Sequence, residues 1–150
     1  MKLRRKIMLW LVASPLALLL LIQAWYLLHI YWWVNHNPTS TAFMRTQLEK
    51  LQEKNPKAKL QHTWVPYNRI SVHLKRAIIA AEDANFAEHD GVDWEALQKA
   101  YEKNAKKGKV VSGGSTITQQ LAKNLFLSGQ RSYLRKAEEM AITFMLEMVM

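Results

Sequence analysis

The chain has 150 residues, with 21 lysines and arginines against 12 aspartates and glutamates, and its formal net charge is +9. Hydrophobic residues make up 49% and charged residues 22%, a composition that argues against an intrinsically disordered chain. Cysteine is absent, which excludes a disulfide framework, a thiolate metal site and a cysteine nucleophile. The length allows one ordinary domain, or a small domain with a tail.

The first 34 residues form a distinct segment, because residues 7–34 contain no aspartate, glutamate, lysine or arginine. As a helix this stretch would be roughly 42 Å long, whereas the hydrocarbon core of a bilayer is about 30 Å thick. The apolar core of a cleaved signal peptide is only about 7–15 residues long. We therefore expect an uncleaved transmembrane anchor over 7–34. The aromatic residues at its far end predict a belt at the outer headgroup level: Trp25, Tyr26, Tyr31, Trp32 and Trp33.

Four cations, Lys2, Arg4, Arg5 and Lys6, precede this anchor. Positively charged flanks stay in the cytoplasm, so residues 1–6 are expected to form a cytoplasmic basic segment. The rest of the chain would then lie on the periplasmic, extracytoplasmic side of the cell inner membrane, held by a single span. A domain in that compartment is not expected to bind nucleic acid.

The rest of the chain is predicted to be mainly α-helical, after a polar linker at residues 35–42. Apolar residues at helical spacing predict helices over 43–54, 71–83, 94–106, 116–126 and 133–150. A loosely alternating stretch at 60–67 predicts an extended piece. The expected helix caps are Ser71, Asp93, Ser132 and a capping box of Thr116 with Gln119. From Met140 onward the last helix is apolar on nearly every face, so we expect it to be buried.

Three stretches of this helical part have residues that suit chemistry. At 80–93 an apolar helix runs into five acids and a histidine, and Glu82 ends the apolar run. A carboxylate beside apolar surface can serve as a general acid or base, although capping acids on a solvated helix end explain the same pattern. A metal site at His89 is a weaker hypothesis, because a second histidine at ligand spacing is lacking.

The second stretch, 113–124, places a glycine turn at a helix N-terminus, where free backbone N–H groups suit an anion. Lys123 and Arg131 lie nearby in sequence, and a well-capped helix without a ligand is the alternative. In the third stretch, Arg135 and Glu139 share one helix face. They form either a surface ion pair or, because the following residues are apolar, charges that enter a cleft.

Together the three stretches resemble the motifs of the family 51 glycosyltransferases, the peptidoglycan polymerases. The resemblance covers 43–150, and the short anchor is more similar to the monofunctional members than to bifunctional penicillin-binding proteins. Because the family domain continues past its third motif, we expect this domain to be incomplete at its C-terminus. The matching runs are Glu82-Asp83-x-x-Phe86-x-x-His89-x-Gly91-x-Asp93, Gly113-Gly114-Ser115-Thr116-Ile117-Thr118-Gln119-Gln120-Leu121-Ala122-Lys123-Asn124 and Arg135-Lys136-x-x-Glu139.

The resemblance implies a lysozyme-like helical domain that joins lipid II units into β-1,4 glycan strands and releases undecaprenyl pyrophosphate. It implies that Glu82 is the base, and that Glu139 orients the cations or a divalent cation, Mg²⁺ or Mn²⁺, on the pyrophosphate, with no organic cofactor. The implied substrate contacts are Ser115, Thr116, Gln119, Gln120, Lys123, Arg131, Arg135 and Lys136. The residues that support the motifs are Asp83, Phe86, His89, Gly91, Gly113, Gly114 and Asn124.

Two other functions fit parts of the same sequence. A non-catalytic, membrane-tethered binder of anionic lipid or glycan would account for the anchor and the basic net charge. A muramidase would suit a lysozyme-like fold, but its acceptor is water and it needs no pyrophosphate cradle. The clustered cations therefore favour the transferase over the muramidase.

The charge asymmetry around residues 7–34 predicts an N-terminus in the cytoplasm and a domain outside it. Alkaline phosphatase, which is active only outside the cytoplasm, should be active when it is fused after residue 40. A reporter that is active only in the cytoplasm should be silent at the same position, and the reverse pattern would contradict this orientation.

Overall fold

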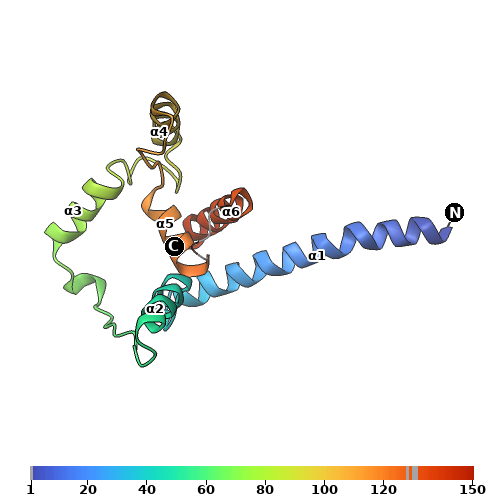
Figure 1. The fold of residues 1–150 in the computed structure, drawn as a ribbon, viewed down its shortest axis with the longest axis horizontal. Coiled ribbons are helices and arrows are strands. Elements are labelled where there is room, and N and C mark those ends of the chain that lie inside the picture. Colours follow the sequence, from blue (N-terminus) through green and yellow to red (C-terminus); the bar gives the residue numbers. More distant parts are fainter. Residues whose placement is uncertain (1, 128, 130–131) are drawn as a thin grey trace.

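The structure is a computed structural model that describes residues 2–127, 129 and 132–150. The expected mainly α fold is confirmed, with no strand among these residues. Figure 1 shows the arrangement of the helices. They are α1 (Lys2–Trp33), α2 (Ala42–Lys54), α3 (Val72–Glu82), α4 (Trp94–Lys107), α5 (Ile117–Phe126) and α6 (Tyr133–Val149), with a 3₁₀ helix at Tyr67–Arg69.

The helix α1 projects away from the other helices over most of its length (Figure 1). Pro15 lies inside it without ending it. An 18-residue window within Lys6–Trp33 has a mean hydropathy of 2.2, so α1 is long and apolar enough to cross a membrane. Its large apolar side chains are exposed at Ile7, Met8, Trp10, Leu11, Val12, Leu16 and from Leu18 to Ile22, which suits a lipid surrounding.

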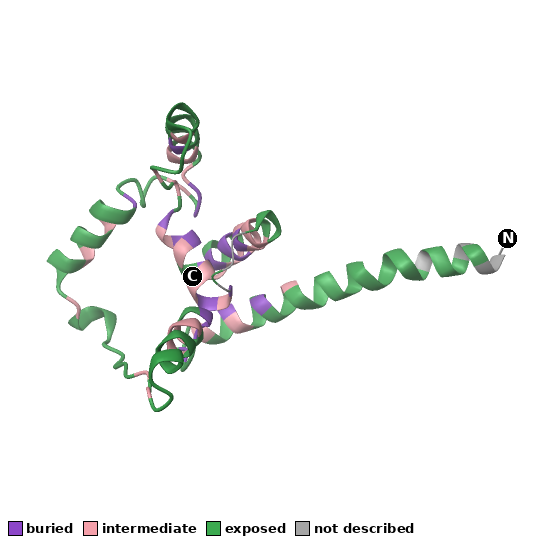
Figure 2. Ribbon diagram, viewed as in Figure 1, coloured by how far each residue is buried: buried purple, intermediate pink, exposed green. Residues whose placement is uncertain are grey.

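The core lies where the end of α1 meets α5 and α6 (Figure 2). Tyr26 and Ile30 of α1 are buried there, and the Tyr26 hydroxyl donates a hydrogen bond of 2.6 Å to Glu138 Oε1 on α6. Trp33 packs against the same core. The aromatic end of α1 is therefore divided between two surroundings: Tyr26 and Trp33 pack against the core, whereas Tyr31 and Trp32 are exposed. Trp25 lies between the two, because it is half exposed but its ring also meets Phe126 edge-on, with the ring centroids 6.0 Å apart. The other buried members of this core are Ala122, Leu125, Leu127, Ile142 and Leu146.

The helix boundaries follow the predictions within about two residues, because short-range polar signals set them. Asp93, Thr116 and Ser132 accept N-terminal backbone N–H groups as expected, and Thr41 does the same for α2. Ser71 is at the N-cap of α3 as expected, but its side chain makes no capping bond to a described residue. The stretch 60–67 pairs with no strand in the described part of the chain, and Tyr67 begins the 3₁₀ helix.

The expected burial of α6 holds for one face only. Ile142, Thr143 and Leu146 are buried, whereas Phe144 and Met148 are exposed. The reason is geometric, since a helix with 3.6 residues per turn presents only one stripe to α1 and α5. Helix α3 lies apart from this core, and each of its residues is exposed or half-buried.

Ile30 is fully buried in the contact between α1 and the rest of the protein. Replacing it with alanine should lower the free energy of unfolding by about 2–5 kcal/mol, because the cavity removes packing that the neighbouring helices cannot restore. Leu28→Ala is the control, since Leu28 is 69% exposed on the same helix. Thermal melting of both variants in detergent tests this, and equal melting temperatures would show that α1 does not dock on the domain.

Candidate functional site

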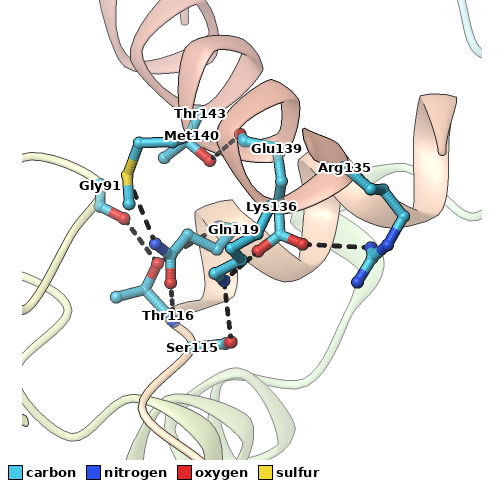
Figure 3. Close-up of polar contacts among 9 residues, drawn as sticks. All are labelled: Gly91, Ser115, Thr116, Gln119, Arg135, Lys136, Glu139, Met140 and Thr143. Atoms are coloured by element: carbon cyan, nitrogen blue, oxygen red, sulfur yellow. Dashed lines mark hydrogen bonds and ion pairs between the residues drawn. The ribbon is translucent and has the colours of Figure 1, made fainter. Parts of the chain in front are cut away.

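The centre of the site is Glu139, a carboxylate of α6 that is only 3% exposed. Arg135 Nη1 donates to its Oε2 at 3.3 Å, and Lys136 Nζ donates to its Oε1 (Figure 3). Both cations lie one turn earlier on the same helix, at the spacing that brings side chains together. A buried carboxylate is tolerated only with such partners. The expectation that at least one of these charges enters a cleft is confirmed, because Arg135 lines the cleft described below.

The two cations on Glu139 also point toward other groups. Lys136 Nζ lies 3.5 Å from the hydroxyl of Ser115, which connects α6 to the turn before α5 (Figure 3). Arg135 Nε is buried and has no hydrogen-bond partner among the described residues. The guanidinium therefore has donor capacity beyond its bond to Glu139.

The start of α5 is held by a buried network. Thr116 and Gln119 form a capping box, with Thr116 N donating to Gln119 Oε1 at 3.1 Å and Gln119 N donating to Thr116 Oγ1 at 3.2 Å. The Thr116 hydroxyl donates to the carbonyl oxygen of Gly91 at 2.6 Å, and Gln119 Nε2 lies 3.7 Å from Met140 Sδ (Figure 3). Through these contacts, Thr116 and Gln119 join the start of α5 to the loop at Gly91 and to α6.

Asp83 connects the first stretch to the second. Its Oδ2 accepts the backbone N–H of Ile117 at 3.0 Å, and its Oδ1 lies 2.9 Å from His89 Nε2. The carboxylate is buried at the N-terminus of α5, where the helix dipole favours a negative charge. The contact fixes the end of α3 beside the start of α5.

Glu82 precedes Asp83 and is exposed to solvent. Its carboxylate is exposed, and its Oε2 accepts a hydrogen bond of 3.0 Å from Gln120 Nε2. Glu82 ends the apolar run of α3 as expected, but this run does not pack against the core, so apolar side chains do not enclose the carboxylate. Glu82 is instead positioned by a polar contact across to α5, where an incoming molecule can reach it.

Among the described residues, one group of side chains has ligand atoms close enough to hold a metal ion: Asp83, His89 and Asp93, within 4.8 Å of one another. Helix capping explains its carboxylates. Asp93 Oδ1 accepts the N–H of Ala96 at 2.8 Å, which lowers the pKa of Asp93 below its usual value, and its Oδ2 accepts from Asn85.

Glu139 is not part of that group. Its two oxygens accept from Arg135 and Lys136. The residues around Glu139 therefore do not fit direct ligation of Mg²⁺ or Mn²⁺.

Two glycines of the motifs permit close approaches that a side chain would prevent. Gly91 has a φ of +76°, and a Cβ there would lie 2.7 Å from Glu147 Cγ. A Cβ on Gly114 would lie 2.8 Å from Leu97 Cα in α4. A Cβ on Gly113 would meet no described atom within 4 Å. Gly91 and Gly114 are thus required by packing, whereas Gly113 is not.

A cleft of about 290 Å³ lies between α2, the end of α5 and the start of α6. Two of the cations predicted from the sequence, Lys123 and Arg135, line it together. Lys50 of α2 also lines it, and sequence reasoning missed this residue. Arg131 lies outside the described residues. The complete lining is Phe43, Thr46, Gln47, Lys50, Lys123, Asn124, Leu127, Gly129 and Arg135.

The remaining predicted residues lie outside this cleft. Ser115, Gln120 and Glu82 are on the side of the α5 N-terminus, joined by the contacts given above. Phe86 lies beside His89, with its ring centroid 6.3 Å from the imidazole. The structure thus separates the predicted residues into two places: an exposed carboxylate near the start of α5, and a cationic cleft at its end.

Comparison with known proteins identifies the family of the chain. Residues 46–150 match the family model described as Transglycosylase. The chain is 71% identical over 147 residues to a biosynthetic peptidoglycan transglycosylase of Janthinobacterium sp. (strain Marseille) and 67% identical over 147 residues to one of Herminiimonas arsenicoxydans. Each match covers 98% of this chain and 64% of the relative. The chain therefore spans less than two thirds of the length of these curated relatives.

The neighbouring glycines at 113 and 114 provide a matched test of the site's packing. Gly114→Ala should lower the free energy of unfolding by roughly 1–3 kcal/mol, because its Cβ would collide with the backbone of α4. Gly113→Ala should change it little, since that position is open. Thermal melting of the two variants measures the difference, and an equal loss in both would contradict the packing described for Gly114.

Proposed function

The chain belongs to the transglycosylase family, and from this premise we propose that it is part of a peptidoglycan glycosyltransferase that polymerises lipid II into β-1,4 glycan strands and releases undecaprenyl pyrophosphate. The observation that carries the proposal is the cleft between α2, α5 and α6. It places Lys123 beside Arg135, and none of its described lining residues is a carboxylate.

The charges of the cleft suit the leaving group of this reaction. A pyrophosphate leaves as an anion, so it needs fixed cations rather than a general acid. Lys123 and Arg135 supply cations from two different helices, and both line the cleft. The carboxylate of Glu139 accepts hydrogen bonds from Arg135 and Lys136, and these bonds fix the positions of both cations.

Glu82 is our candidate for the general base. It is exposed, and Gln120 holds its carboxylate from α5. In the proposed step Glu82 takes the proton of the acceptor's 4-hydroxyl, and that oxygen forms a bond to the anomeric carbon of the donor. The bond from this carbon to the pyrophosphate oxygen breaks, and the electron pair leaves with the pyrophosphate. Displacement from the opposite face inverts the carbon and gives the β-1,4 link.

The apolar helix α1 supports the proposed location. Lipid II and the growing undecaprenyl-linked glycan are confined to a membrane, and a single-pass anchor would confine the enzyme to the same surface. We place the domain on the periplasmic side of the inner membrane, with the N-terminus in the cytoplasm. The rival function, a tethered binder of anionic lipid or glycan, would use the same cleft but would not need Glu82.

Glu82→Gln separates these functions. It keeps the size of the side chain but removes the base, so lipid II polymerisation by the intact protein should fall by about two to four orders of magnitude. Binding to the cleft should change little, because its cations remain. Glycan synthesis and thermal melting are measured on the same preparation.

The control for this variant is Glu102→Gln on α4. Glu102 is also an exposed carboxylate that accepts a hydrogen bond from a glutamine, Gln98, at 3.0 Å. Glu102→Gln should keep the parental polymerisation rate. A folded Glu82→Gln protein that polymerises lipid II at the parental rate would remove Glu82 from the mechanism.

A further inference from the structure

One face of α2 forms a wall of the cleft, and it contributes a cation that the motifs do not include. Phe43, Thr46, Gln47 and Lys50 all line the cleft. Their spacing of three, four and seven residues places them on a single stripe of the helix. Lys50 is therefore brought to the cleft by the geometry of α2, and not by a local sequence signal.

Lys50 makes no ion pair in the part of the chain that the structure describes, although Glu49 and Glu53 lie on the same helix. Lys123 likewise makes none in that part of the chain, and Arg135 is paired only with Glu139. Three cations thus face one small cleft from three separate helices, and like charges gathered without carboxylates favour an anion between them.

We propose that Lys50 is a third diphosphate-binding residue, which closes the cation cleft from the side of α2. This inference deepens the proposed function, and it rests on a diphosphate-linked substrate. Phe43 and Leu127 line the same cleft, so a ligand that joins a diphosphate to an apolar chain matches both the charged and the apolar parts of the lining.

The position of α2 gives this residue a specific role. Helix α2 follows the membrane helix after a short linker and packs against α5. A cation on α2 can therefore hold the diphosphate from the side where the chain leaves the anchor, whereas Lys123 and Arg135 hold it from α5 and α6. Removing Lys50 should weaken binding without altering the chemistry at Glu82.

The experiment measures binding of farnesyl diphosphate to the chain, with its N-terminal helix, in nanodiscs of zwitterionic lipid. The variants are Lys50→Gln, Lys123→Gln and the control Arg45→Gln, which removes one exposed cation from another face of α2. Lys50→Gln should weaken binding about fivefold to tenfold, close to the loss of one charge-assisted contact at a partly exposed site. Arg45→Gln should bind as the parent does, and Lys50→Arg should restore most of the affinity.

The outcomes separate the two proposals. If Lys123→Gln weakens binding and Lys50→Gln does not, Lys50 does not bind the diphosphate, but the cleft is still its binding site. If neither variant weakens binding, the cleft does not hold the diphosphate and the proposed function loses its main support. Thermal melting of each variant identifies a folding defect, and a folded Lys50→Arg protein that binds no better than Lys50→Gln also overturns the inference. Weakened binding in Arg45→Gln as well would mean a non-specific charge effect, and would overturn it too.

Discussion

The buried carboxylate of Glu139 is the constraint on which the site depends. A charge inside a helical core costs free energy unless cations pair with it, and Glu139 meets that need with two cations from its own helix. The same pairing fixes where those cations point. Arg135 lies at the cleft, and Lys136 reaches across to Ser115 before α5. One buried acid thereby positions Arg135, a cation that the proposed reaction uses, and also fixes Lys136 beside Ser115.

Asp83 provides the second constraint, because it joins parts of the chain that local forces do not connect. Its carboxylate caps the backbone of Ile117 and contacts His89, so the end of α3 is held at the start of α5. Glu82 is the next residue, and Gln120 is one turn into α5, which explains why their side chains meet. The proposed base is therefore located by its structural neighbour, and its own side chain remains free to face an acceptor.

The sequence predicts local features of this structure better than distant contacts. The caps at Asp93, Thr116 and Ser132 act over three residues, so the residue types alone indicate them. The contact between Tyr26 and Glu138 joins residues 112 positions apart, and no local pattern specifies it. The sequence did not predict Lys50 as a cleft residue for the same reason, because only the packing of α2 on α5 brings it to the same cleft as Lys123.

The docking of α1 explains why its uncharged stretch is longer than a bilayer requires. Tyr26, Ile30 and Trp33 lie on one stripe of the helix and pack against the domain, so this end belongs to the protein core. The part before it, residues 7–25, would be about 28 Å long as a helix, close to the roughly 30 Å of a hydrocarbon core. Because the same helix is continuous through both parts, the domain cannot swing freely on a linker. If α1 spans a membrane as we propose, this rigid connection would hold the cleft at a fixed height above the membrane surface, as a ligand with a diphosphate at the headgroup level and an apolar chain in the bilayer would require.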